Sequence, residues 1–463
     1  MSINLAHSPD SAPAQPLPPR TRGLPVVGAL PAFMRGPFDF FLAARERYGD
    51  IYTLDLGFLR WVIVNHPRHA EYILRDNSQN YRKGGGLWDM LRTMLGNGLV
   101  VSEGDFWLRQ RRMIQPHFHR KQLAGLTDAM VAAAAEGLER WDAAAAGQQP
   151  VDLLREFSPI TMRVIARALF GQGLAQADLE RVSEVIAFAM DYLMLGSITY
   201  SLPKWLPIPG ARRYLAALRE FDALVAKIIT RERNATTPSA SLLMMLVHMI
   251  DEESGERMTN AQLSDEVKTF FLAGYETTSL TLTWSLSLLS QYPEVMDKLR
   301  AEVDTVLADR TPSFADLPAL SYTRMVIQEA MRLRPASWWV PRMAVADDVI
   351  DGYAIPAGTT VVSLTYGIHH HPDAWAQPDR FDPDRFTSEQ VAQRHKHAWI
   401  PFGMGQRQCI GKDFSIMEAQ IILAMIVQRY TLTAVPGPPV LPKLSSTLKP
   451  NRPVFMHVEQ RAR

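Results

Sequence analysis

Residues 401–411 read Pro-Phe-Gly-Met-Gly-Gln-Arg-Gln-Cys-Ile-Gly, and they place three glycines around Cys409, the one cysteine of the chain. Glycine permits backbone angles and close approaches that other residues forbid, so the backbone can turn its amide N–H groups toward the sulfur. Apolar residues recur at helical spacing after Cys409, and the start of a helix favours an anion. Both effects are expected to lower the pKa of Cys409 and to favour the thiolate, which is the form that binds a metal.

A glycine-rich surface turn or a small buried thiol is the plainer interpretation of this stretch. The full pattern Phe-Gly-x-Gly-x-Arg-x-Cys-x-Gly is more specific than either, and it resembles the heme-binding signature of the cytochrome P-450 superfamily at every defining position. The resemblance implies that Cys409 is the axial ligand of a heme iron and favours cleavage of the O–O bond of dioxygen. It also assigns Phe402, Gly403, Arg407 and Gly411 to the heme-binding loop.

A long helix is predicted from Ala261 to Tyr292, ahead of Pro293. Thr259 and Gln262 form a capping-box pattern at its start. At 1.5 Å per residue, about 30 residues would extend roughly 45 Å, which is enough to cross a whole domain.

Inside this helix, residues 273–278 read Ala-Gly-Tyr-Glu-Thr-Thr and match the oxygen-activation motif of the same superfamily. Glycine within a helix costs about 1 kcal/mol relative to alanine, so its presence asks for a reason. The resemblance implies that Gly274 leaves room for dioxygen, that Thr277 hydrogen-bonds it and that Glu276 relays protons toward it. The alternative, a polar patch that only contacts solvent, is disfavoured by apolar neighbours such as Phe271.

Glu329 and Arg332 stand three residues apart, so their charges lie on one face of a helix. A surface pair of this spacing is common and contributes little. In the superfamily the pair is buried and joined by a second arginine, which corresponds to Arg385 here; Asp384 precedes it where glutamate is frequent. The resemblance therefore implies a structural triad of Glu329, Arg332 and Arg385 that stabilises the core near the heme.

Four side chains correspond to family positions that contact the heme propionates: Trp107, Arg111, Arg342 and Arg407. Trp107 and Arg111 share a helix face because they are four residues apart. Arginine suits this role because its planar guanidinium binds carboxylates in a bidentate manner. The four motifs occur in the family's order between residues 107 and 411.

The resemblance implies a monooxygenase that uses heme b and dioxygen to hydroxylate a C–H bond or epoxidise an alkene. Segments equivalent to the family's substrate pocket are apolar, which favours a medium-sized apolar substrate such as a terpenoid or a fatty acid. A peroxide-driven peroxygenase and a non-catalytic heme-binding sensor are the alternatives. The predicted pocket residues are Leu87, Trp88, Leu91, Phe188, Met190, Phe270, Ala273, Trp338 and Trp339.

Electrons must then come from a separate protein, because the family fold accounts for the whole chain and leaves no reductase domain. A basic patch on the face beneath the heme would attract an acidic ferredoxin or flavodoxin, whose reductase would be a further partner. The alternative is an ordinary solvated surface. The residues expected in this patch are Arg109, Arg112, Arg120, Lys121, Lys396 and Lys412.

Composition agrees with a globular enzyme: 47% of the 463 residues are hydrophobic, 21% are charged, and the formal net charge is +1. Such a balance, without a basic tail, gives no sign of nucleic-acid binding. A single cysteine excludes a disulfide framework within the chain. No run approaches the roughly 18 apolar residues that span a bilayer, and no signal peptide is evident, so we expect a cytoplasmic monomer without a membrane anchor.

The predicted fold class is mainly α with minor β: a single large cytochrome P-450 domain over residues 26–463 in which the long helix crosses over the heme. Residues 1–25 are rich in proline and are expected to form a flexible arm. Strands are predicted at Ile51–Leu56, Trp61–Val64, Val349–Ile355 and Thr359–Leu364. His369, His370 and His371 are interpreted as a loop before Pro372 and not as a metal site.

Overall fold

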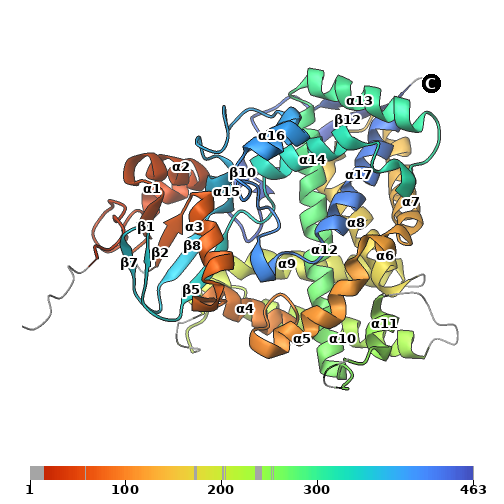
Figure 1. Cartoon of the computed structure of the whole chain (residues 1–463). Helices are drawn as coiled ribbons and strands as arrows, with labels where there is room; N and C mark the ends of the chain where they lie inside the picture. The colour runs from red at the N-terminus through yellow and green to blue at the C-terminus, as the bar shows by residue number, and fades with distance from the viewer. Residues whose placement is uncertain are drawn as a thin grey trace, which may run out of the picture.

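The computed structural model describes residues 15–57, 59–171, 175–200, 203, 205–234, 242–251, 253 and 255–461. About 58% of the chain is helical and the sheets are small, which confirms the predicted fold class. Helices form the larger part of the molecule, and the main sheet lies at the side where the chain begins (Figure 1).

The long predicted helix is α12 (Asn260–Leu289), which runs through the middle of the helical part (Figure 1). Its capping box forms as expected: the Gln262 amide donates to Thr259 Oγ1 at 3.2 Å, and the Thr259 amide donates to Gln262 Oε1 at 2.7 Å. The helix stops before the predicted Tyr292, because the last residues ahead of the proline close tighter turns, such as Gln291 N–H to the Leu288 carbonyl.

Helices α8 (Leu153–Phe170), α14 (Ser321–Leu333) and α17 (Lys412–Arg429) pack against α12. The helix predicted after Cys409 is α17. The other helices are α1 (Leu30–Arg35), α2 (Pro37–Tyr48), α3 (Pro67–Glu71), α4 (Gly86–Leu95), α5 (Gly104–Ile114), α6 (Arg120–Ala124), α7 (Thr127–Ala146), α9 (Gln176–Thr199), α10 (Ala211–Arg233), α11 (Leu242–His248), α13 (Pro293–Leu307), α15 (Thr365–His369) and α16 (Ser388–Gln393).

The main sheet has five strands in the order β1-β2-β8-β5-β3. They are β1 (Ile51–Asp55), β2 (Arg60–Val64), β8 (Thr360–Ser363), β5 (Val340–Ala344) and β3 (Tyr81–Arg82). Strands β1 and β2 form the predicted hairpin, and β8 joins β2 in parallel. Smaller sheets contain β4 (Val151–Asp152), β9 (Tyr430–Ala434), β10 (Pro442–Lys443), β11 (Lys449–Pro450) and β12 (Phe455–Gln460).

The single strand predicted at Val349–Ile355 is wrong. The segment forms an antiparallel hairpin of β6 (Asp348–Ile350) and β7 (Tyr353–Ile355). Asp351 and Gly352 form the turn, with φ of 51° and 85°. An Asp-Gly pair favours this kind of tight turn, and that signal was present in the sequence.

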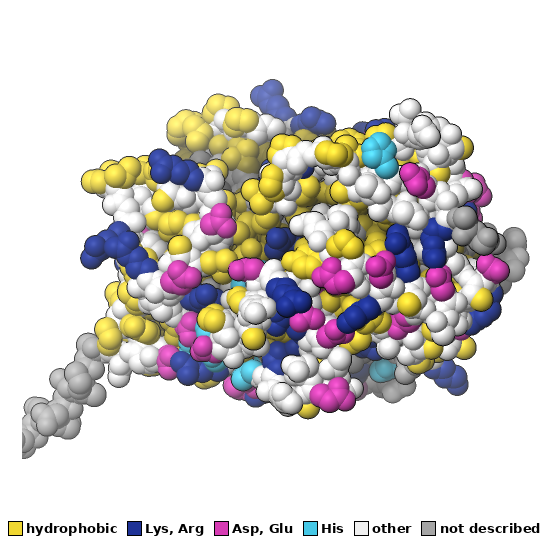
Figure 2. All heavy atoms as spheres, turned by 90° about the horizontal axis from the view of Figure 1, so that it is seen from above, with side chains coloured by type: hydrophobic (Ala, Val, Ile, Leu, Met, Phe, Trp, Pro, Cys, Tyr) yellow, Lys and Arg dark blue, Asp and Glu magenta, His cyan; other side chains and the backbone are white. Residues whose placement is uncertain are grey.

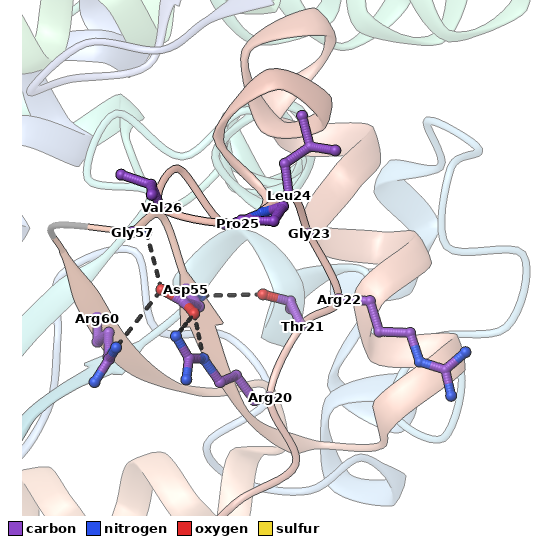
Figure 3. Close-up of a pocket in the computed structure, with 11 residues that line it drawn as sticks. Arg20, Thr21, Arg22, Gly23, Leu24, Pro25, Val26, Asp55, Gly57 and Arg60 are labelled. Atoms are coloured by element: carbon purple, nitrogen blue, oxygen red, sulfur yellow. Dashed lines mark hydrogen bonds and ion pairs between the residues drawn. The ribbon is translucent and has the colours of Figure 1, made fainter.

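Residues 15–25 pack against the sheet, which differs from the flexible arm predicted for residues 1–25; residues 1–14 lie outside the described part of the chain. The Thr21 amide donates to the Thr53 carbonyl at 2.9 Å, and the Thr53 amide donates to the Pro19 carbonyl at 2.8 Å. Arg20 and Arg60 both form ion pairs with Asp55 (Figure 3). A proline-rich segment can be held in this way because its carbonyls still accept hydrogen bonds.

A pocket of 650 Å³ lies beside this segment and contains none of the predicted site residues; Figure 3 shows Arg20, Thr21, Arg22, Gly23, Leu24, Pro25, Val26, Asp55, Gly57 and Arg60 around it. Acidic and basic side chains are interspersed over the face drawn in Figure 2, in keeping with the near-neutral net charge. Among the described residues, no helix has both the length and the apolar character to cross a bilayer.

Candidate functional site

The cysteine loop has the curled backbone that its glycines predict. Gly403 and Gly405 have φ of 66° and 68°, a region that side chains disfavour. A methyl group on Gly405 would also meet the Leu74 carbonyl oxygen at 2.3 Å. The Cys409 amide donates to the Phe402 carbonyl at 2.9 Å, which closes the loop. The Cys409 side chain is accessible at the end of this loop.

The expected lowering of the Cys409 pKa is wrong for the chain on its own. Although the Cys409 side chain is accessible at its end, the surrounding protein atoms desolvate the sulfur and raise the pKa of this thiol; the Gly411 amide and the nearby Arg111 guanidinium partly oppose the rise. Desolvation disfavours the charged form and is the larger effect here. Coordination to a metal ion deprotonates a thiol outright, so a bound iron would hold Cys409 as the thiolate.

Beyond its first two turns, α12 is accessible in one short stretch. From Glu266 to Leu289 every residue of this helix is buried except Ala273, Gly274 and Thr277, which are accessible in whole or in part. Ala273 and Thr277 share a face, and the Thr277 hydroxyl donates to the Ala273 carbonyl at 2.9 Å. The middle of this helix thus leaves a small residue and a hydroxyl accessible among buried neighbours.

The α12 stretch lies beside the helix that follows the cysteine loop. Thr278, next to Thr277, is 3.1 Å from Ser415 of α17, oxygen to oxygen, and Ser415 follows Cys409 by six residues. Thr277 and Cys409, which are both accessible, therefore belong to neighbouring elements.

Gly274 has a structural reason besides the one expected. A methyl group at this position would lie 2.7 Å from the Ile165 side chain of α8. The missing side chain thus lets α8 and α12 approach closely, and room for dioxygen at Gly274 stays a prediction from the sequence. Ala273 is the small residue on the accessible face.

A cluster of buried cations lies between the sheet and the cysteine loop. Arg342 is buried and donates one hydrogen bond, to the Pro341 carbonyl, and burial lowers its pKa to about 10. Burial also holds the pKa of Lys83 well below its usual range, and Arg342 and Arg407 lower it further. Among the described residues, Glu103 is the one carboxylate that acts on these three cations, and Arg407 pairs with it at 2.6 Å. Buried cations in excess of carboxylates indicate a site for an anion.

This cluster fits the two propionates of a heme, and it includes residues that the sequence did not indicate. Lys83 was missed because it stands in a loop, outside every recognised motif. Trp88, predicted to line the substrate pocket, instead lies against Lys83 and Arg342, with ring centroids 5.2 and 5.4 Å from the two charges. Its indole donates to the Pro341 carbonyl at 3.1 Å.

Trp107 and Arg111 of α5 contact different parts of the cysteine loop. Trp107 is buried, and the Arg407 guanidinium stacks on its ring at 3.7 Å. Arg111 donates to the Gln408 carbonyl at 2.9 Å and to Gln115 at 2.9 Å. Arg111 thus supports the cysteine loop from its own side.

Glu276 has a partner that the sequence did not predict. Its Oε1 lies 2.8 Å from Lys449 Nζ, and that ammonium also lies 2.9 Å from Asp191 Oδ1 of α9. The Oε2 atom of Glu276 is buried without a hydrogen-bond partner. No local pattern in the sequence indicates this pair, because Lys449 follows Glu276 by more than a hundred residues.

Glu329, Arg332 and Arg385 come together as expected. The Arg332 guanidinium donates to both carboxylate oxygens of Glu329, at 2.7 and 2.8 Å, and both side chains are fully buried. Arg385 lies 3.4 Å from the same carboxylate. Further bonds from Arg332 to the carbonyls of His369 and Pro378, each 2.7 Å, tie α14 to the following loops.

The remaining predicted pocket residues separate into two groups. Six of them stand on α4 (Leu87, Leu91), α9 (Phe188, Met190) and α12 (Phe270, Ala273), and α4 packs against the other two helices. The Phe188 ring contacts Arg213 of α10, and the Phe270 ring contacts Phe118. Trp338 and Trp339 stack on each other at 4.7 Å and belong to the aromatic core around α1 and α2, against which Leu87 also packs.

His369 ends α15, and His370 and His371 follow it in the predicted loop before Pro372; all three side chains are buried. His371 Nε2 lies 2.9 Å from Asp50, and His66 is close enough for the three side chains to share an ion. However, Nδ1 of each ring already accepts a backbone amide, from Asp373 and from Arg68, both at 3.2 Å. The Nε2 atoms then carry hydrogens, and that of His371 donates to Asp50.

A family model described as Cytochrome P450 matches residues 18–458. The chain is a cytochrome P450. Its relatives include the cyclooctat-9-en-7-ol 5-monooxygenase of Streptomyces melanosporofaciens, which is 34% identical over 93% of this chain and 94% of that protein. The pentalenene oxygenase of Streptomyces avermitilis is 32% identical over 92% of this chain and 93% of that protein.

Solved structures give the same answer for this P450. The cytochrome P450DA heme domain superposes with a TM-score of 0.87 at 27% identity, covering 97% of this chain and 98% of that chain. The chain is accordingly a P450 monooxygenase of the kind that uses heme iron and dioxygen, takes electrons from a redox partner and binds a substrate.

The basic patch expected on this P450 is smaller than the sequence suggested. Arg109 pairs with Glu256 at 2.5 Å, and Arg112 pairs with Asp251 at 2.7 Å and Glu253 at 2.5 Å. These two charges are neutralised within the chain. Lys121, Lys396 and Lys412 form no ion pair within the described residues, and the side chain of Arg120 lies outside them.

Proposed function

We propose that this P450 binds heme b through Cys409 and oxidises a terpenoid at a C–H bond or an alkene. The observation that carries the proposal is the combination of an accessible thiol, a buried excess of cations and an accessible Ala273–Thr277 face on neighbouring elements. A non-catalytic heme sensor would need the first two features, but it has no need of the hydroxyl and acid on α12.

When bound, the heme supplies the oxidising chemistry, and the side chains supply binding and protons. Lys83, Arg342 and Arg407 hold the heme carboxylates. Thr277 and Glu276 conduct protons, because one atom of dioxygen enters the substrate and the other leaves as water with two electrons and two protons. A cytoplasmic ferredoxin or flavodoxin with its reductase supplies the electrons.

The terpenoid class is supported by apolar side chains on α4, α9 and α12 and by relatives named for cyclooctat-9-en-7-ol and pentalenene. We expect pentalenene to shift the heme spin state at lower concentration than dodecanoic acid does, because the described pocket helices place no unpaired cation for a carboxylate. A titration of the purified holoenzyme by absorbance measures this. A larger shift with dodecanoic acid would instead indicate fatty acids, and turnover that needs only hydrogen peroxide would indicate a peroxygenase.

Replacing Thr277 with alanine is expected to divert electrons from product to hydrogen peroxide. Proton transfer by a positioned group contributes about 10²-fold or more, so product formation should fall at least about tenfold. The fold should be unaffected, because the Thr277 hydroxyl bonds only to its own helix. Product and peroxide per NADPH consumed give the result, and Thr277→Ser, which keeps the hydroxyl, is the control. Unchanged coupling in Thr277→Ala would remove this residue from proton delivery.

A further inference from the structure

The Lys449 side chain connects three elements that are far apart in the chain. It extends from β11, and its ammonium lies 2.8 Å from Glu276 of α12 and 2.9 Å from Asp191 of α9. The Asp191 side chain is 66% exposed, Lys449 is 17% exposed and Glu276 is 7% exposed. The three charges thus form a line from the surface of α9 to the acid of α12.

The backbone around Lys449 is fixed, so its side chain is presented from a firm base. The Leu448 amide donates to the Ala336 carbonyl at 2.9 Å, and the Leu448 carbonyl accepts the Trp284 indole at 2.9 Å. Across the hairpin, Lys449 pairs with Lys443 of β10, whose side chain is exposed. Only one of these two neighbouring lysines points to the site.

The charge balance makes Lys449 a permanent cation. Burial alone would lower its pKa, but the neighbouring carboxylates of Glu276 and Asp191 outweigh burial and raise it. An ammonium that keeps its proton does not pass protons along. It holds the two carboxylates in place, and it occupies Oε1 of Glu276 while Oε2 is left without a partner.

We propose that Lys449 is a positioning residue that couples helix α9 to the orientation of the proton-delivering acid Glu276. With α9 in place, Lys449 fixes Oε1 and leaves Oε2 for proton transfer. A shift of α9 moves Asp191 and releases the lysine. Asp191 adjoins Met190, a predicted pocket residue whose carbonyl accepts the Ser446 hydroxyl at 3.2 Å. A substrate that contacts this part of α9 therefore also changes the orientation of the Glu276 carboxylate. The inference rests on the proton-delivery role given to Glu276 above.

The first test needs no turnover. Hydrogen–deuterium exchange of the holoenzyme is measured over residues 185–199 of α9. Lys449→Met and Asp191→Asn should each raise exchange there by about twofold or more, because both remove the tie to α9. Glu276→Gln keeps the tie between Lys449 and Asp191 and should leave α9 unchanged. Lys443→Met is the matched control on the opposite strand, and Lys449→Arg should restore protection.

The second test uses the same variants with pentalenene as the probe and a ferredoxin system as electron donor. The share of consumed dioxygen released as hydrogen peroxide should rise about threefold in Lys449→Met and in Glu276→Gln, and it should return toward the wild-type value in Lys449→Arg. The Lys443→Met control should match wild type.

The outcomes separate the inference from the function beneath it. Peroxide release that rises in Glu276→Gln but not in Lys449→Met would overturn the role of Lys449 and leave the proton role of Glu276 intact. No rise in either variant would overturn the proton role itself. If peroxide release rose in Lys449→Met without greater hydrogen–deuterium exchange in α9, Lys449 would act on Glu276 alone. That result would overturn the coupling between α9 and Glu276.

Discussion

Replacing Cys409 with serine is expected to abolish the thiolate signature of the reduced, carbon-monoxide-bound spectrum and to stop monooxygenation. A hydroxyl is a far weaker base for iron than a thiolate, and it does not supply the electron density that favours O–O cleavage. Removing groups that only support a metal ligand costs about 10–100-fold, so loss of the ligand itself should exceed 100-fold. Spectra of the reconstituted protein and product formation per heme measure the effect.

The matched control for this substitution is Gly411→Ala. A methyl group at Gly411 would lie 4.0 Å from the Cys409 sulfur, an ordinary contact, and the φ of −84° suits alanine. The variant should therefore keep the thiolate signature and most of its activity. A Cys409→Ser protein that still gave the wild-type spectrum would show that the iron has another axial ligand.

Replacing Arg332 with alanine should have the largest effect on stability. It would leave Glu329 fully buried without its bidentate partner and would remove the ties to the carbonyls of His369 and Pro378. Breaking a buried pair on one side costs about 3–5 kcal/mol. We expect the free energy of unfolding, measured by urea denaturation with circular dichroism as the signal, to fall by this amount. Heme content after purification should also fall sharply.

Arg385→Ala is the comparison, because Arg385 is the outer member of the triad. It contacts Glu329 only at 3.4 Å, and its side chain is 12% exposed. We expect a loss of about 1 kcal/mol, as for a single hydrogen bond. Equal losses for both arginines would contradict the view that Arg332 provides the central contacts.

The parts of the fold that were predicted are those that short-range signals determine. The α12 helix begins where a side chain and a backbone amide cap each other within four residues, and β1 and β2 are joined by a short turn. The hairpin at residues 348–355 was missed because its apolar pattern was given more weight than its Asp-Gly turn. Residues 15–25 were misjudged because composition does not reveal which carbonyls will find a partner.

The site residues also fall into those that local motifs predict and those that distant contacts determine. Cys409, Arg407 and the Ala273–Thr277 face follow from local motifs. Lys83 and Lys449 act through partners that lie far away in sequence, and a single lysine in a loop gives no local sign of such a partner. Trp338 was assigned to the pocket from its position in the chain, and its indole donates to the Ser445 carbonyl in an aromatic core. Packing among distant segments decided these cases.

The segment at residues 19–21 affects whether two molecules can associate through the edges of their main sheets. Strand β1 ends the main sheet, and an edge strand offers unpaired amides and carbonyls to any extended chain nearby. Here the backbone groups of Thr53 are taken by Pro19 and Thr21, and the Asp55 amide is taken by the Thr21 hydroxyl. The protein thus covers its own sheet edge and withholds it from strand addition by a second molecule.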